Sequence, residues 1–122
     1  MKTTSSADGT QIAFEQWGTG PPLLLVHGMT GNRSNFGLIR PGLQDCFTVV
    51  AMDRRGRGDS GDSAGYAIER EIEDVDAVIH ALDAPVLLFG HSFGALCALG
   101  TAMHSNRLSG LILYEPASKV VE

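Results

Sequence analysis

The sequence predicts an α/β fold, a mostly parallel sheet with flanking helices. Short runs of apolar residues, such as Leu23–Val26 and Val86–Phe89, are typical of parallel strands covered on both faces. They alternate with segments of helical periodicity, and this alternation produces a parallel sheet with right-handed crossovers. With 122 residues, 43% of them hydrophobic, the chain can form at most one domain with a core of its own.

The first element is expected to be a hairpin within Thr3–Trp17. Asp8-Gly9 is a strong turn signal. Gln11–Trp17 alternates polar and apolar residues, as a half-buried strand does. A loop rich in glycine and proline then leads to the apolar strand Leu23–Val26.

A helix and a second apolar strand are expected next. Asn32 or Ser34 can cap a helix that runs to about Leu43, with a break or kink at Pro41. Phe47–Met52 is then a further buried strand.

The following loop, Asp53–Gly61, is polar and rich in glycine, and it needs positive φ angles in several places. After it, apolar residues recur at intervals of three and four, which predicts a helix that ends before Pro85. The apolar stripe consists of Ile68, Ile72, Val75, Ile79 and Leu82, and the acidic residues Glu69, Glu71, Glu73 and Asp76 lie off it.

The C-terminal third predicts a strand, a helix and another strand. Val86–Phe89 is a short buried strand, and a tight turn on Ser92 leads into a helix from near Phe93 to about His104. Small residues in this helix allow it to pack closely on the sheet. Leu108–Tyr114 is the last strand, and its continuous apolar end is typical of a central strand rather than an edge.

The turn on Ser92 has the pattern G-x-S-x-G, written here Gly90-His91-Ser92-Phe93-Gly94. A strained strand-to-helix turn needs small residues two positions before and after the serine, because a Cβ there would collide with the neighbouring strand or helix. Such a turn exposes the hydroxyl above the carboxyl end of the sheet and aims the first helix amides at the same point. The alternative is a glycine-rich turn of any parallel α/β domain.

Composition excludes several classes of function. A net charge of −5, with Arg54, Arg55 and Arg57 as the only tight basic cluster, argues against nucleic acid as a partner. No apolar run approaches the roughly 20 residues of a membrane span, and the start lacks the apolar core of a signal peptide. Cys46 and Cys97 show no metal-binding spacing. We therefore expect a cytoplasmic protein with free thiols, no cofactor, no metal and no membrane partner.

Three motifs in this order resemble the α/β-hydrolase fold superfamily. They are His27-Gly28 after a buried strand, Asp53-x-x-Gly56-x-Gly58-x-Ser60 after the next, and the Ser92 turn. The resemblance covers nearly the whole chain and implies that residues 1–122 are the N-terminal portion of a hydrolase core domain. Relatives continue after the sixth strand with a cap and further strands, so the end at Glu122 is expected to be a cut inside the cap region.

The resemblance also implies roles for individual residues. Ser92 matches the catalytic nucleophile, and the backbone N–H groups of Met29 and Phe93 match the two oxyanion donors. Five residues match structural motif positions: His27, Gly28, Asp53, Gly90 and Gly94. The Asp53–Ser60 loop is expected to shape the pocket floor and to tie neighbouring turns together.

The general base is expected to be missing from this chain. The family order places an acid and then a histidine after the serine. His104, the only histidine after Ser92, lies about 18 Å away along the helix. His91 lies on the sharp turn, His80 lies on a helix, and His27 is commonly structural in this family. Glu115 is a candidate for the acid, because some relatives, including haloalkane dehalogenases, keep the acid there.

The predicted function is a serine hydrolase of an ester, thioester, lactone or similar small acyl substrate. Relatives with epoxide hydrolase or dehalogenase chemistry carry Asp at the Ser92 position and are disfavoured, whereas C–C bond hydrolases, haloperoxidase-like esterases and lyases stay open. A complementary C-terminal fragment is expected to supply the base, or the chain self-associates through the open sheet edge. The alternative is a catalytically incomplete fragment or a non-enzymatic interaction module.

Overall fold

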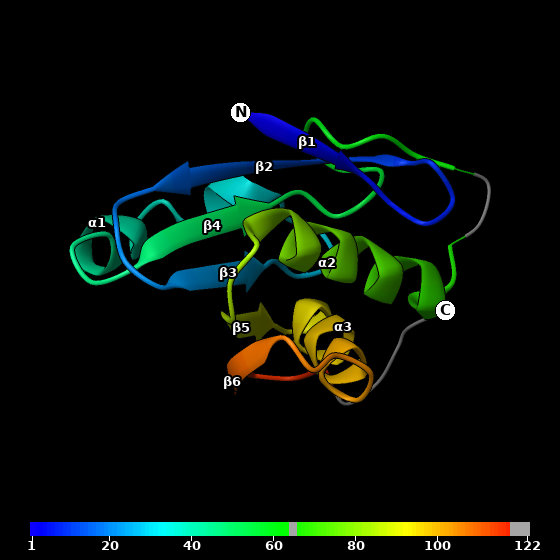
Figure 1. Ribbon diagram of the computed structural model, residues 1–122. Coiled ribbons are helices and arrows are strands. Elements are labelled where there is room, and N and C mark those ends of the chain that lie inside the picture. Colours follow the sequence, from blue (N-terminus) through cyan, green and yellow to red (C-terminus); the bar gives the residue numbers. More distant parts are fainter. Residues whose placement is uncertain (64–65, 118–122) are drawn as a thin grey trace.

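The computed structural model describes residues 1–63 and 66–117, which form a six-stranded sheet with helices on both faces (Figure 1). The spatial order is β1-β2-β4-β3-β5-β6. The four strands from β4 to β6 are parallel, and β2 is antiparallel to both of its neighbours. The strands are β1 (Lys2–Ser5), β2 (Gln11–Trp17), β3 (Pro22–Val26), β4 (Thr48–Met52), β5 (Val86–His91) and β6 (Leu108–Tyr114). The predicted α/β class is confirmed.

Each face of the sheet has its own apolar cluster, because successive strand residues point to opposite faces. The long helices α2 (Ile68–Leu82) and α3 (Phe93–Ala102) pack on one face over the larger cluster, which includes Leu24, Val26 and Leu88. The short helices η1 (Arg33–Phe36) and α1 (Arg40–Leu43) lie on the other side, where Phe36 belongs to a second cluster and Leu43 packs against it.

The expected helix to about Leu43 is interrupted, but the predicted position of the break is wrong: the gap between the two short helical segments lies at residues 37–39, before Pro41. Asn32 does act as a cap: its side-chain oxygen accepts from the Ser34 N–H at 2.9 Å. Pro41 lies in the first turn of α1 and does not kink a longer helix. Proline fits this position because the first helical amides need no intrahelical acceptor.

Helix α2 lies where the sequence predicts it, but the prediction of which of its residues are buried is partly wrong. Glu71 is buried, as is Asp74, whereas apolar Ile68 at the start of the stripe is exposed. Helix α2 ends where Asp83 adopts a left-handed conformation with φ 51°. Its buried surface therefore carries an acidic row beside the apolar one.

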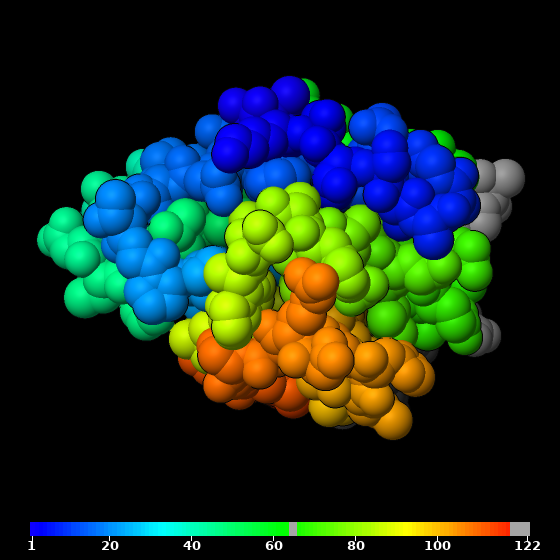
Figure 2. All heavy atoms as spheres, viewed as in Figure 1, coloured from blue at the N-terminus to red at the C-terminus, as the bar shows by residue number. Residues whose placement is uncertain are grey.

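Strand β6 is the last strand of the sheet, and within the described residues it pairs with β5 alone. Ile112 and Tyr114 on β6 are 43% and 53% exposed, and Leu99 and Met103 near the end of α3 are also exposed. Figure 2 shows the β6 region at the lower margin of the molecule. The apolar pattern predicted a central strand, so the edge position leaves apolar side chains and one row of backbone groups uncovered.

No helix within residues 1–63 and 66–117 is both long enough and apolar enough to cross a membrane.

Candidate active site

The predicted site residues meet at one edge of the sheet, because the carboxyl ends of β4, β3, β5 and β6 all lie there. His27 and Gly28 follow β3, Asp53 follows β4, Ser92 follows β5 and Glu115 follows β6. A Cβ on Gly28 would lie only 3.4 Å from the Ser92 Cβ. The loop after β3 and the turn after β5 are therefore in contact.

Ser92 has an unusual backbone conformation for a residue other than glycine, with φ 57° and ψ −118°. Its N–H donates to the Tyr114 carbonyl at 3.1 Å, and its carbonyl accepts from the N–H groups of Ala95 at 3.0 Å and Ala117 at 3.3 Å. These bonds hold a strained turn whose side chain is partly exposed.

The glycines on both sides of Ser92 are required by close packing. A Cβ on Gly90 would lie 2.3 Å from the Gly94 carbonyl oxygen, and a Cβ on Gly94 would lie 2.3 Å from the Val26 carbonyl oxygen. Neither backbone atom can move away without displacing α3 or β3. The predicted collision at both flanks is confirmed.

Two backbone amides, one in the loop that contacts Ser92 and one directly after Ser92, have no acceptor within the described residues. Phe93 is the first residue of α3, where an amide has no intrahelical partner. The Met29 N–H likewise donates to no described acceptor. The Phe93 ring is buried, whereas the Met29 side chain is 40% exposed.

His27 is a buried, neutral side chain with both ring nitrogens occupied. Its Nε2 accepts the Arg54 N–H at 3.0 Å, so the ring proton must lie on Nδ1, which donates to the Gly28 carbonyl at 2.7 Å. Burial lowers the pKa of His27 below its usual value. With its only lone pair occupied, His27 has the structural position that the motif implies.

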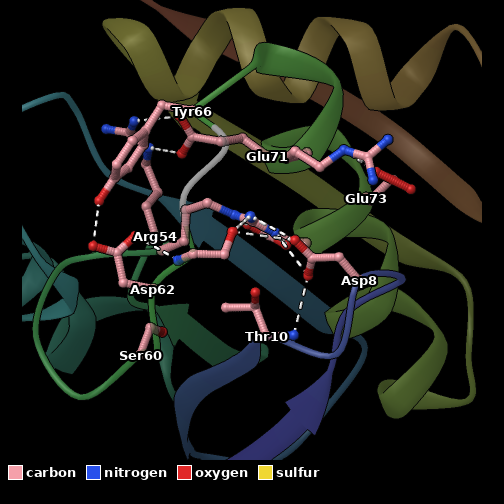
Figure 3. A network of polar contacts seen from close by, with 12 residues as sticks. Asp8, Thr10, Arg54, Ser60, Asp62, Tyr66, Glu71 and Glu73 are labelled. Atoms are coloured by element: carbon pink, nitrogen blue, oxygen red, sulfur yellow. Dashed lines mark hydrogen bonds and ion pairs between the residues drawn. The ribbon is translucent and has the colours of Figure 1, made fainter.

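The Arg54 guanidinium contacts the loop after β3. Its Nε and Nη2 each donate to the Glu71 carboxylate at 2.7 Å (Figure 3). Its Nη1 donates to the Gly28 carbonyl at 3.0 Å. The guanidinium also stacks over the Phe93 ring, 4.5 Å from its centroid. Sequence reasoning missed both residues, treating Arg54 as part of a basic cluster and Glu71 as a residue off the buried stripe.

Asp53 connects its own loop to the start of η1. Its carboxylate accepts from the Arg33 N–H at 2.7 Å and the Asp59 N–H at 2.9 Å, and it pairs with the Arg33 side chain. The Ser60 hydroxyl donates to the Asp53 carbonyl at 2.6 Å. Gly56 and Gly58 have positive φ angles, as predicted for this loop.

No side chain within the described part of the chain hydrogen-bonds to the Ser92 hydroxyl. The His91 ring packs on the Tyr114 ring, with 5.4 Å between the ring centroids, and His80 contacts Asp76 on α2. His104 is exposed beyond the end of α3. Glu115 is exposed with φ 46°, and its carboxylate raises the pKa of Tyr114.

Two hollows lie near this region, and neither is centred on Ser92. The larger, about 410 Å³, lies between η1 and the sheet and is lined by residues such as Trp17, Phe36 and Asp59. The smaller, about 200 Å³, is lined by residues that include Phe89, His91 and Tyr114. Ser92 is not among the lining residues of either hollow.

The same residues contain no group of three or more His, Cys, Asp and Glu side chains that could hold a metal ion. Cys46 and Cys97 are free thiols, and burial raises the pKa of Cys97 to about 12.

A parallel sheet with a strained serine between β5 and a closely packed α3 has the architecture of the α/β hydrolases. Residues 23–121 match the model of the alpha/beta hydrolase family, and the chain belongs to this family.

Individual relatives agree with this assignment. The chain is 31% identical over 118 residues to the uncharacterized hydrolase YraK of Bacillus subtilis, an alignment that covers 93% of this chain and 44% of that protein. An alpha/beta hydrolase from Sphaerobacter thermophilus is similar in structure with a TM-score of 0.91 and 44% identity, over 99% of this chain and 47% of that one. An esterase from Exiguobacterium antarcticum has a TM-score of 0.90 and 30% identity, over 96% and 46%. The chain thus spans slightly less than half the length of these relatives.

Proposed function

We propose that this chain carries the nucleophile of a hydrolase that cleaves an ester, thioester, lactone or similar small acyl substrate. The observation that carries the proposal is the strained Ser92 turn between β5 and α3, together with the Met29 and Phe93 amides, which have no acceptor among the described residues. The likeness to the Exiguobacterium antarcticum esterase favours ester-type substrates.

In the proposed mechanism the Ser92 Oγ attacks the acyl carbonyl carbon. The carbonyl oxygen becomes an oxyanion that accepts hydrogen bonds from the Met29 and Phe93 amides, each worth roughly 2.7–4 kcal/mol of barrier. Loss of the alcohol or thiol leaves an acyl-serine, which water then hydrolyses. Both steps need a general base, because a serine hydroxyl is a weak nucleophile at neutral pH.

We propose that a C-terminal polypeptide part supplies this base, and with it the acid. No described histidine contacts the Ser92 hydroxyl, and the chain spans less than half of its relatives. The open edge of β6 and the exposed apolar residues beside it offer a surface for such a part. Glu115 at the end of β6 stays a candidate for the acid.

The second candidate is a catalytically incomplete fragment or an interaction module with the same fold. The observation that favours it is the same missing contact to the Ser92 hydroxyl. A fluorophosphonate probe distinguishes the two, because labelling of Ser92 requires an activated hydroxyl. Two free thiols favour a reducing compartment such as the cytoplasm.

The first test replaces the nucleophile. In the catalytically complete protein, Ser92→Ala should lower hydrolysis of a small chromogenic ester by roughly 10³-fold or more with the fold intact. Ser5→Ala on the exposed face of β1 is the matched control and should keep full activity. Unchanged esterase activity in Ser92→Ala would refute the assignment.

The second test concerns the open edge. Native mass spectrometry of the isolated protein should find this 12.9 kDa chain bound to, or continuous with, the part that carries the base. Ile112→Glu on β6 should weaken this assembly, whereas Leu38→Glu, at a residue that is 97% exposed between η1 and α1, should not. A lone monomer with a cooperative melt and normal turnover contradicts the proposal, and self-association through β6 contradicts its choice of partner.

A further inference from the structure

We propose that Arg54 is a positioning residue, held by Glu71, that fixes the direction of the Met29 amide in the oxyanion site. This inference rests on the proposed function and adds to it the side chains that orient the oxyanion donors.

The first step is the geometry of a single peptide unit. The Gly28 carbonyl and the Met29 N–H belong to the same peptide, which is planar and trans, so the two groups point in opposite directions. Whatever fixes the carbonyl therefore also fixes the N–H. The Gly28 oxygen accepts from Arg54 Nη1 at 3.0 Å and from His27 Nδ1 at 2.7 Å. Both lone pairs of this carbonyl are occupied on the side away from the Met29 amide.

The second step is that one guanidinium contacts both donor residues. Arg54 bonds the peptide that carries the Met29 amide, and its plane stacks on the ring of Phe93, which carries the other amide. Its main-chain N–H also sets the tautomer of His27. Arg54 thus connects the loop after β3 to the first residue of α3.

The third step is the role of Glu71 on α2. Its carboxylate accepts from Nε and Nη2, which leaves Nη1 directed at the Gly28 carbonyl. Arg54 is 3% exposed and Glu71 6%, so the pair is shielded from water and held in one orientation. Lysine cannot reproduce this arrangement, because its ammonium lacks the planar fork of arginine.

The fourth step is electrostatic. A charged donor on a carbonyl polarises the peptide and strengthens its N–H as a donor. The effect acts on charge that develops only in the transition state, so loss of Arg54 should lower kcat more than it changes KM.

The test uses the catalytically complete protein and the double variant Arg54→Met/Glu71→Leu. Replacing both partners leaves no unpaired buried charge, so the variant should fold. We expect kcat for a small chromogenic ester to fall about 10- to 100-fold, less than the 10²–10³-fold that loss of a whole donor costs, with KM within about twofold. Affinity for a boronic acid that mimics the tetrahedral intermediate should fall in parallel.

The matched control is Arg55→Met/Asp74→Leu, which removes the neighbouring buried pair. Arg55 makes no described contact with Gly28 or Phe93, so this variant should keep kcat per folded molecule. Arg54→Lys serves as the second test variant and should recover only part of the lost rate, with melting curves giving the folded fraction of each protein.

Wild-type kcat in a folded Arg54→Met/Glu71→Leu or Arg54→Lys protein would overturn the inference, and so would an equal loss in the Arg55 control. The proposed function is judged separately by Ser92→Ala. If Ser92→Ala is inactive while the Arg54 variants are fully active, the inference alone fails.

Discussion

Arg54 and Arg55 are adjacent arginines whose side chains have different surroundings. Each is buried, and each makes two hydrogen bonds to an acid of α2, Glu71 for the first and Asp74 for the second. Arg54 also donates a hydrogen bond to the Gly28 carbonyl, whereas Arg55 also donates one to the Asp8 carboxylate in the β1–β2 turn.

A buried arginine–carboxylate pair therefore has two different roles in this protein. The Arg55 pair connects the N-terminal hairpin to α2, and its side chains make no described contact with Gly28, Met29, Ser92 or Phe93. The Arg54 pair contacts the Gly28–Met29 peptide and the Phe93 ring, beside the two amides that have no acceptor among the described residues. Glu71 and Asp74 are three residues apart and therefore lie on one helix face, so a single face of α2 holds both arginines.

The largest expected effect is the loss of stability when the Arg55–Asp74 pair is broken. Arg55→Met leaves Asp74 buried and uncompensated, so the free energy of unfolding should fall by about 3–5 kcal/mol, while kcat per folded molecule stays unchanged. Urea unfolding measures the first quantity and kinetics on the complete protein the second. Arg70→Met, which removes a partly exposed pair with Glu73, is the control and should cost less than about 1 kcal/mol. An equally small loss for Arg55→Met would mean that burial does not separate these pairs.

The same comparison shows where sequence reasoning succeeds. Strand order along the chain, the Ser92 turn and its glycines follow from local patterns, because apolar periodicity and steric limits act over a few residues. The collision distances at Gly90 and Gly94 confirm that part directly.

Glu71 shows where sequence reasoning fails. Periodicity assigns a charged helix residue to solvent, and only the tertiary arrangement brings Arg54 across to pair with it. The misplaced break in the helix expected up to Leu43 has a similar cause: a capping signal at Asn32 determines where a helix starts but not how long it is. Among the described residues no side chain hydrogen-bonds to the Ser92 hydroxyl, so the pattern around the turn predicts the backbone conformation of Ser92 and not the contacts of its hydroxyl.

The smallest expected effect lies at the outer end of the Arg55 network. Asp8 lies at the surface, and its hydrogen bond to Arg55, followed by bonds to Thr10, holds the pKa of this carboxyl well below its usual value of 3.8. A carboxyl with a lower pKa in the folded state stabilises the fold above the unfolded pKa. This contribution is lost as pH falls from about 4 towards the folded value. Asp8→Asn should therefore melt below wild type at pH 7, by less than Arg55→Met, and the gap should narrow at pH 3. Asp45→Asn, at an exposed aspartate with no ion pair among the described residues, should show no such pH-dependent gap. A gap for Asp8→Asn that stays constant from pH 7 to pH 3 would show that its carboxylate charge contributes nothing to holding the hairpin on Arg55.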